Sequence, residues 1–544
     1  MRKLLNILLI AAAAALYGCS SVDLEPTNQY DISYGVSTPA NTELYLNSFY
    51  PIIRNFSQFG SYALGGSNAS MSDGLTDILK YGAIVAGAGD CNLIMTVDGQ
   101  QSISNNYFNA WTGCYGWIRR INEFLDALDK TNALTAQQKE RYRGEALFFR
   151  GYCWFLIMRA HASVKDDLGV IIYKDIKDMT TAGKNRARAS VSDSWDLVYE
   201  DLSYAIAHLP APEAASGRID KYAAEAIAAR AMLYAGRYSL AKTLATDIID
   251  NGPYDLDGNE AILSFNFLKD NLTHLYDSRY SSPGDVCLSG NYGSGLAGPT
   301  QEFVDMFDNQ DGSPFDISNT ARRFITDENV GSRDPRLAKA VLWNGTQWKG
   351  RTMDIYENGV DMKYMPYGAY NSPGNTVTGY YIRKNLDPDN RDYILDGSYQ
   401  SWTESRLAEI LLIRAECLAA ENDFAGALAD VVTLRKNRFG RDDVITPAIT
   451  SWDSALDVIL KERAVELCFE GHRFWDLRRT GRAAAVLDGK KFNGVLWKKS
   501  GSTFTAELIS CDMGVHRYPE RFDRFPIPQN EISNNTEAKQ NSDW

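Results

Sequence analysis

The sequence of 544 residues has few of the side chains that build metal or disulfide sites. It contains five histidines, none in an HExxH arrangement, and eight cysteines without a CxxC pair. An acidic run at 308–311 lacks the spacing of a calcium-binding EF-hand loop. We therefore expect no metal and no cofactor. Cys153, Cys417 and Cys468 lie within apolar helical patterns, which favours buried thiols over disulfides.

Long basic runs are also absent. The formal net charge is −13, and lysines and arginines do not gather along any segment. A nucleic-acid-binding protein usually presents a basic face, so we expect no nucleic-acid partner. No segment after the N-terminus is apolar for long enough to span a bilayer.

The N-terminus has the features of a secretory signal. Arg2 and Lys3 precede a short apolar run from Leu4 to Leu16, which is too short for a comfortable membrane span. The run ends at a Leu-Tyr-Gly-Cys sequence similar to the lipobox of bacterial lipoproteins. We expect a signal peptide at 1–18, lipidation of Cys19 as a membrane anchor, and a polar tether at 19–40. An ordinary cleaved signal with an incidental cysteine is the alternative.

Two segments share the pattern of a helical hairpin repeat. Residues 221–250 break at Ala-Gly-Arg before Tyr238, and residues 404–436 break at Glu-Asn-Asp before Phe424; an alanine, Ala241 or Ala427, follows each aromatic at the third place. An aromatic that opens the second helix, with a small residue one turn on, is typical of tetratricopeptide repeats.

The sequence therefore predicts one mainly α domain at 41–544. Its tetratricopeptide-like helical scaffold comprises 41–254 and 401–544, with helical patterning that starts near Thr42. Between about 255 and 400 the chain is rich in glycine, asparagine, aspartate, serine and tyrosine. A long irregular insertion is usually functional, so we expect a loop-rich ligand-binding region with short strands there, for example at 379–385.

The stretch from Lys461 to Arg479 concentrates charged residues around a few large apolar ones. In a helix predicted at 452–470, Arg463 lies on the apolar stripe, Glu466 and Glu470 lie along the same face, and Arg473 follows Gly471. A buried arginine needs carboxylate acceptors, so these four charged residues suit a structural lock between helices. General acid–base catalysis would need open carboxylates instead.

Several segments resemble the SusD/RagB family of outer-membrane nutrient-binding lipoproteins. Residues 406–416 look like its "R.AEv.L..AE" helix, KERAVELCFEGHRFWDLRRTG looks like its "ER..EL.fEG.R..DL.R.g" signature, and the segment 525–544 resembles its closing "PIP..Ei..N….QN.gW" pattern. The resemblance implies a SusD-like fold, an oligosaccharide or peptide ligand, no catalytic activity, and a SusC-like TonB-dependent transporter as partner.

No motif transfers ligand-binding residues onto this sequence, so composition selects the candidates. Sugar recognition needs flat aromatic faces for the rings, and amides or carboxylates for the hydroxyls. The candidates are Asn68, Asp73, Tyr107, Tyr276, Tyr280, Tyr292, Trp343 and Trp348. For each of them, packing in the core or between loops is the alternative.

We predict a cell-surface, lipid-anchored protein of the outer membrane that captures oligosaccharides and delivers them to a SusC-like transporter. Three alternatives stay open: a peptide-binding member of the same family, a glycoside hydrolase with two open carboxylates about 5–10 Å apart, and a structural repeat protein that docks partners along its repeats.

Overall fold

The computed structural model describes residues 32–56, 72–81, 90–180, 183–212, 217–362, 376–512 and 514–544. The predicted signal peptide, Cys19 and Asn68 lie outside this part of the chain. No helix within it is long and apolar enough to cross a membrane.

The first helices begin earlier than the sequence pattern predicts. After α2 (Ile32–Gly35), helix α3 (Pro39–Asn47) starts before Thr42, because the Thr38 side chain accepts a hydrogen bond from the backbone N–H of Asn41 and a proline follows it at the first helical position. Short α4 (Pro51–Phe56) and α5 (Asp90–Thr96) follow.

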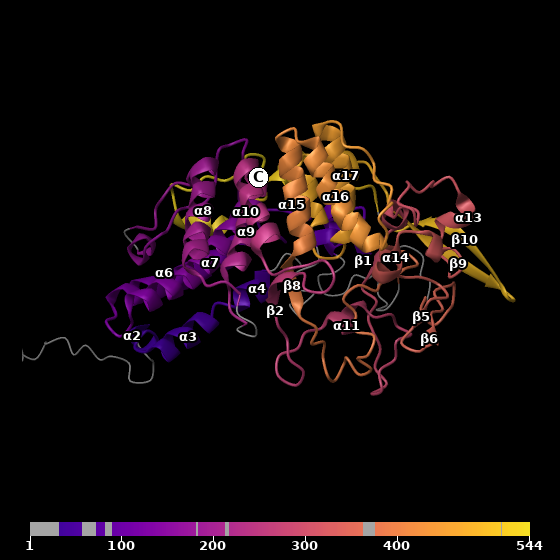
Figure 1. Ribbon diagram of the computed structural model, residues 1–544, viewed down its shortest axis with the longest axis horizontal. Coiled ribbons are helices and arrows are strands. Elements are labelled where there is room, and N and C mark those ends of the chain that lie inside the picture. Colours follow the sequence, from indigo (N-terminus) through magenta and orange to yellow (C-terminus); the bar gives the residue numbers. More distant parts are fainter. Residues whose placement is uncertain are drawn as a thin grey trace, which may run out of the picture.

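Paired helices form the scaffold. The pairs are α6 (Trp111–Lys130) with α7 (Ala136–His161), α8 (Val191–His208) with α7, α9 (Lys221–Tyr234) with α10 (Tyr238–Asn251), and α15 (Leu407–Ala420) with α16 (Phe424–Phe439). Tyr238 and Phe424 open α10 and α16, and Ala241 and Ala427 are fully buried, which lets each pair approach closely. Helices α8, α10, α15, α16 and α17 (Trp452–Glu466) stand side by side in Figure 1. The prediction of helical hairpins is confirmed.

The loop-rich region lies below the hairpins and to their right in Figure 1. It holds α11 (Tyr276–Tyr280), α12 (Gln301–Met306), α13 (Thr320–Arg323) and α14 (Pro335–Ala340), with short antiparallel pairs β4 (Val341–Leu342) with β7 (Tyr381–Ile382) and β5 (Gln347–Trp348) with β6 (Arg351–Thr352). Strand β7 falls within the predicted strand at 379–385.

Two further ladders join this region to the rest. Strand β2 (Ala261–Phe265) pairs with β8 (Trp402–Arg406), which brings the two ends of the insertion together directly before α15. Strand β1 (Leu79–Tyr81) pairs with β3 (Ala297–Pro299), so an N-terminal segment extends into the insertion. The insertion is therefore anchored on both sides.

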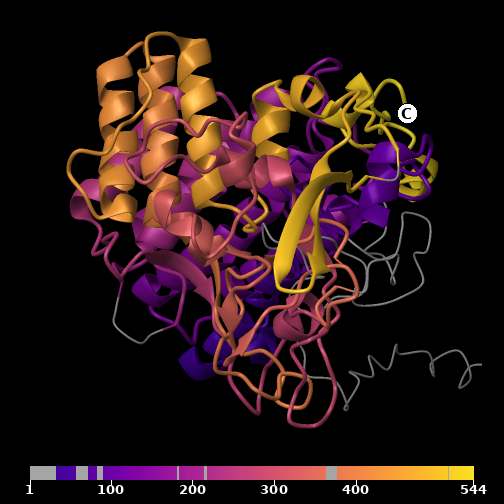
Figure 2. The same ribbon diagram turned by 90° about the vertical axis from the view of Figure 1, so that its right-hand side faces the viewer.

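The C-terminal part is less helical than expected. Helix α17 ends at Glu466 rather than 470, because Phe469 and Gly471 take left-handed backbone angles, φ 60° and 81°. Helices α18 (Arg473–Arg479) and α19 (Ala483–Leu487) follow. A β-hairpin of β9 (Asn493–Ser500) and β10 (Thr503–Ser510), which the helical pattern did not predict, stands in front of the other elements in Figure 2. The chain then passes through η4 (Glu520–Asp523) and α20 (Gln529–Asn534).

Candidate functional site

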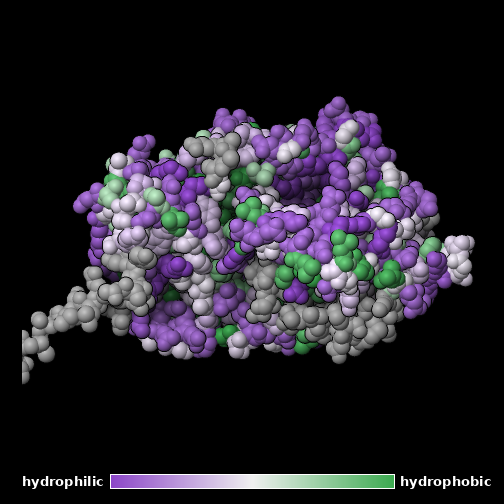
Figure 3. Space-filling model, turned by 90° about the horizontal axis from the view of Figure 1, so that it is seen from below, coloured by the Kyte–Doolittle hydropathy of each residue, from purple (hydrophilic) through white to green (hydrophobic). Residues whose placement is uncertain are grey.

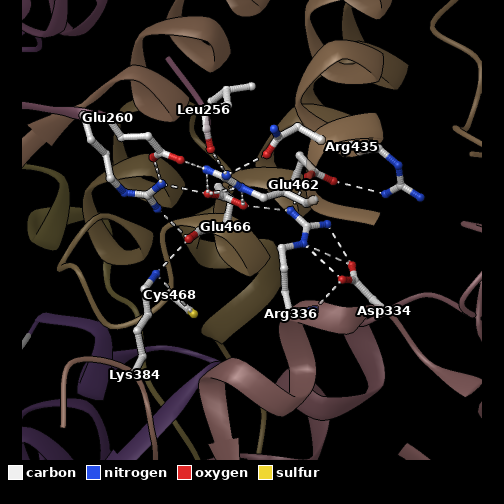
Figure 4. A network of polar contacts seen from close by, with 12 residues as sticks. Leu256, Glu260, Asp334, Arg336, Lys384, Arg435, Glu462, Glu466 and Cys468 are labelled. Carbon is white, nitrogen blue, oxygen red and sulfur yellow. Dashed lines mark hydrogen bonds and ion pairs between the residues drawn. The ribbon is translucent and has the colours of Figure 1, made fainter. Parts of the chain in front are cut away.

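A buried network of ion pairs surrounds the end of α17 (Figure 4). The Glu466 carboxylate accepts hydrogen bonds from three guanidinium groups: Arg406 at 2.7 Å, Arg438 at 2.9 Å and Arg336 at 3.0 Å. These arginines come from β8, α16 and α14, so one carboxylate joins the loop-rich region to two parts of the scaffold.

Glu470, Arg473 and Arg463 extend the network. Glu470 accepts from Lys384 and Arg406 at 2.6 and 2.7 Å. Arg473 pairs in a bidentate manner with Asp77, and Arg463 pairs with Asp476 of α18 at 2.7 Å. Arg463 thus binds an acid across the turn after α17 instead of the two glutamates along its own helix, because the helix ends before residue 470.

Glu466 and Glu470 of this network stay ionised. Burial alone would raise the pKa of the Glu470 carboxyl, but the Arg406 and Lys384 cations outweigh it and lower that pKa to about 2. Glu466, with three arginines around it, has a pKa well below its ordinary value. Buried, paired and ionised carboxylates suit a lock between elements, and they lack the raised pKa that a general acid requires.

Asp73 differs from these acids because no cation among the described residues pairs with it. Its carboxylate accepts the backbone N–H groups of Gly471 and Arg473 at 3.0 and 3.1 Å, at the start of α18. Full burial raises its pKa to about 7, although the two backbone hydrogen bonds oppose that rise. As placed here, Asp73 caps a helix and is closed to a ligand.

Four of the selected aromatic residues are buried as well. Tyr276, Tyr280, Trp343 and Trp348 are at most 4% exposed and belong to the core of the loop-rich region. Their polar atoms bind protein groups: the indole N–H groups of Trp343 and Trp348, for example, donate to Asp327 and Asp285. This position argues against direct ligand contact, because the four side chains form the hydrophobic core of the loop-rich region and present almost no surface to solvent.

Tyr292 and Tyr107 remain accessible. Tyr292 is 56% exposed in a loop of the insertion. Tyr107 is half-buried, and its hydroxyl accepts hydrogen bonds from the amides of Gln100 and Asn105 at 2.6 and 2.9 Å. Its backbone N–H donates to the side chain of Gln101. Gln101 is one of the residues that line a neighbouring surface depression.

That depression is open and has a volume of about 430 Å³. Trp544 forms its aromatic wall: the indole stacks on Phe522 with a 2° angle between the rings, and its N–H donates to the Arg524 carbonyl at 2.7 Å. Polar side chains complete the lining, namely Gln101, Ser102, Ser104, Arg521, Gln529 and Asp543. Gln101 is buried and its amide is bonded to Asn106 and Tyr107, so the groups beside the ring that can meet sugar hydroxyls are the Gln529 amide, the serine hydroxyls and the Asp543 carboxylate.

Sequence reasoning found only the edge of this depression. The loop composition predicts Tyr107 but neither Trp544 nor Gln529, because the C-terminal segment carries a family pattern and no sign of a binding surface beyond it. The feature of the sequence that could indicate a binding surface here is a tryptophan close to amide side chains at 540–544. Its proximity to residues 99–104 depends on the tertiary fold.

The chain belongs to the SusD family. The family model described as "SusD family" matches residues 259–544, and a second model, described as "Starch-binding associating with outer membrane", matches residues 66–233. A SusD-like protein of Formosa agariphila is 24% identical over 456 residues, which cover 79% of this chain and 81% of that protein.

Solved structures share the fold. A SusD-like protein of Bacteroides fragilis superposes with a TM-score of 0.74 at 23% identity, covering 95% of this chain and 99% of its own. A SusD-like carbohydrate binding protein of the same species gives 0.75 at 22% identity, covering 94% and 100%. A laminarin binding SusD-like protein gives 0.65 at 19% identity, covering 93% and 100%.

Proposed function

We propose that this protein binds oligosaccharides at the depression beside Trp544 and hands them to a transporter of the SusC type. The observation that carries the proposal is a tryptophan ring beside an exposed amide, hydroxyls and a carboxylate in an open hollow. Membership of the SusD family and the carbohydrate-binding names of two structural relatives support it. Binding without cleavage is part of the proposal.

The N-terminal features complete the proposal. A lipid on Cys19, followed by the polar tether, would hold the folded domain at the outer membrane, on the cell surface. The second family description, which mentions association with the outer membrane, supports this location.

Trp544→Ala should weaken oligosaccharide binding by about tenfold or more, because truncating a central aromatic typically costs at least about 1–2 kcal/mol. The measurement is isothermal titration calorimetry of the protein without its signal, against malto- and laminari-oligosaccharides. Trp544→Phe, which keeps a ring, should bind more tightly than the alanine variant.

The matched control uses two neighbouring side chains of α20. Gln529 lines the depression and Asn530 does not, and both are exposed. Gln529→Ala should weaken binding, whereas Asn530→Ala should not. Binding that is unaffected by Trp544→Ala would remove the depression from the proposal. Binding of peptides but of no glycan would favour the peptide-binding alternative, and cleavage of the sugar would favour the hydrolase.

A transporter would dock on the loop face of the molecule. Exposed apolar side chains gather on the loops 268–275, 286–292 and 394–395, and they include Leu288, which is 84% exposed, and Leu395. Contacts between Ser289 and Asp392 and between Lys269 and Asp396 hold these loops together. Figure 3 shows hydrophobic side chains grouped on this lower face. Exposed apolar groups of this kind often mark protein interfaces.

The double variant Leu288→Asp/Leu395→Asp should lose co-purification with the transporter from outer membranes, while its melting temperature and oligosaccharide affinity stay unchanged. Leu44→Asp, at an exposed leucine of α3, is the control and should co-purify normally. Full retention of the transporter by the double variant would place the docking surface elsewhere.

A further inference from the structure

The β9–β10 hairpin has one covered edge and one open edge. On the outer side of β9, the Val495 N–H donates to the Thr378 carbonyl at 2.9 Å, and the Trp497 carbonyl accepts from the Glu357 N–H at 2.7 Å. On the outer side of β10 no such neighbour lies among the described residues, and β9 is the only strand of that part of the chain that pairs with it. Figure 2 shows the hairpin standing in front of the other elements, so its open edge faces outward.

The backbone groups that point out of this edge follow from the ladder. Successive pairs of an antiparallel ladder alternate in the direction of their backbone groups. Because the Val495 N–H points away from β10, its partner Leu508 directs its own N–H and C=O away from β9. The same holds for Ala506, opposite Trp497, and for Phe504 two residues earlier. No described group outside the ladder pairs with the backbone of these three residues, so β10 presents a row of open donors and acceptors.

Strand β10 has few of the features that usually protect an open edge. It is eight residues long, contains no proline or glycine, and carries Glu507 as its only charged residue. Its ladder runs without a bulge. Short length, proline, bulges and several charges are the common safeguards against pairing with another chain. Phe504 and Leu508, 40% and 41% exposed, lie on one face of the strand. An edge of this kind is suited to the addition of another strand.

The side chains of β10 make a second copy of the same strand the fitting partner. In an antiparallel pair centred on Ala506, Phe504 of each strand lies opposite Leu508 of the other, which joins the exposed apolar groups twice. Glu507 then lies opposite the neutral Thr505. A pair centred one residue later would place Glu507 opposite itself, where like charges repel, and a pair centred one residue earlier would separate the apolar groups. Charge and apolar pattern therefore select one register.

We propose that this protein forms a two-fold symmetric dimer through its β10 edges, which joins two hairpins into one four-stranded antiparallel sheet. The pairs across the two-fold axis exchange N–H···O=C bonds, and these satisfy the outward groups of Phe504, Ala506 and Leu508. The interface is a single strand pair, smaller than that of an obligate dimer, so we expect a dissociation constant in the micromolar range. The inference does not depend on the function proposed above, because the depression beside Trp544 lies on other elements.

Sedimentation velocity of the protein without its signal, over a concentration series that reaches the millimolar range, tests the dimer. The sedimentation coefficient should rise with concentration, and amide hydrogen exchange at Phe504, Ala506 and Leu508 should slow over the same range. Ala506→Pro should weaken the dimer at least about tenfold, because it removes one outward N–H from each copy and leaves the hydrogen bonds to β9 intact. Ile445→Glu, at an exposed apolar residue in the loop after α16, is the control and should dimerise like the native protein.

Two charge variants test the register and do not depend on proline. Phe504→Glu and Leu508→Lys each place a charge opposite an apolar side chain of an identical copy, and each alone should weaken the dimer at least about fivefold. In a mixture, the introduced glutamate lies opposite the introduced lysine, so the mixed dimer should be tighter than the dimer of either variant. Thermal melting checks that each variant is folded, and these two variants decide the matter if Ala506→Pro does not fold. The proposal fails if the native protein stays monomeric throughout the series, if folded Ala506→Pro dimerises like it, or if the mixture associates no more than the separate variants.

Discussion

Glu466→Gln should lower the free energy of unfolding by about 3–5 kcal/mol, the cost expected for removing one partner from a buried ionic network. The side chain of Glu466 accepts hydrogen bonds from Arg336, Arg406 and Arg438. Glutamine keeps the shape but removes the negative charge, which leaves these three cations with less compensation. Urea-induced unfolding, followed by circular dichroism, measures the change.

The control for this variant is Glu507→Gln. Glu507 pairs with Lys498 across the exposed β9–β10 hairpin, where ion pairs contribute little, so its loss should change stability by less than about 1 kcal/mol. Equal effects of the two variants would show that burial of the network adds nothing to its strength. A double variant with Arg438→Met should be more stable than the sum of the two single effects predicts.

His161→Gln should become less destabilising as the pH falls. Burial, and next the Arg188 cation, lower the pKa of His161 to about 3. The imidazole of an unfolded chain titrates near 6.5. Below that pH the imidazole binds a proton in the unfolded chain but stays neutral in the folded protein. The free energy of unfolding of the unmutated protein therefore falls by up to about 1.4 kcal/mol per pH unit. The variant has no imidazole at this position and escapes that loss.

Unfolding free energies of both proteins between pH 7 and 4.5 measure this difference. The difference between the unmutated protein and the variant is needed because Asp73 is present in both. Its pKa is raised to about 7, so it changes the free energy of unfolding in the opposite direction over the same pH range. His472→Gln is an independent second case, since burial lowers the pKa of His472 to about 4. Differences that do not vary with pH would mean that neither imidazole stays neutral inside the fold.

The hairpin scaffold could be predicted because its signals are local. The breaks before Tyr238 and Phe424 and the alanines one turn later specify each hairpin within about 30 residues of sequence. The end of α17 could not be predicted in the same way. Its apolar stripe continues past Glu466, but the left-handed backbone of Phe469 is imposed by packing against Phe303 and its neighbours in the core.

Composition identified the loop aromatics but not the direction in which they point. Tyr276 and Tyr280 lie one turn apart on α11, so both face the interior together. Trp343 and Trp348 find their acceptors, Asp327 and Asp285, in loops 16 and 63 residues away. Trp544 lines the accessible depression together with residues of 99–104, which lie about 440 positions earlier in the sequence. Such pairings depend on tertiary structure, and a single sequence contains no local sign of them.

The contact between Asp77 and Arg473 has a consequence for how the protein is assembled. The two residues are 396 positions apart, and the Ser72 hydroxyl, which donates to the Gly471 carbonyl, spans 399. During synthesis the Asp77 carboxylate can therefore pair with Arg473 only after most of the polypeptide has been made. Chains that stop short of α18 would leave Asp77 without this counterion, so a truncation near the C-terminus should also destabilise the N-terminal segment that carries Asp77.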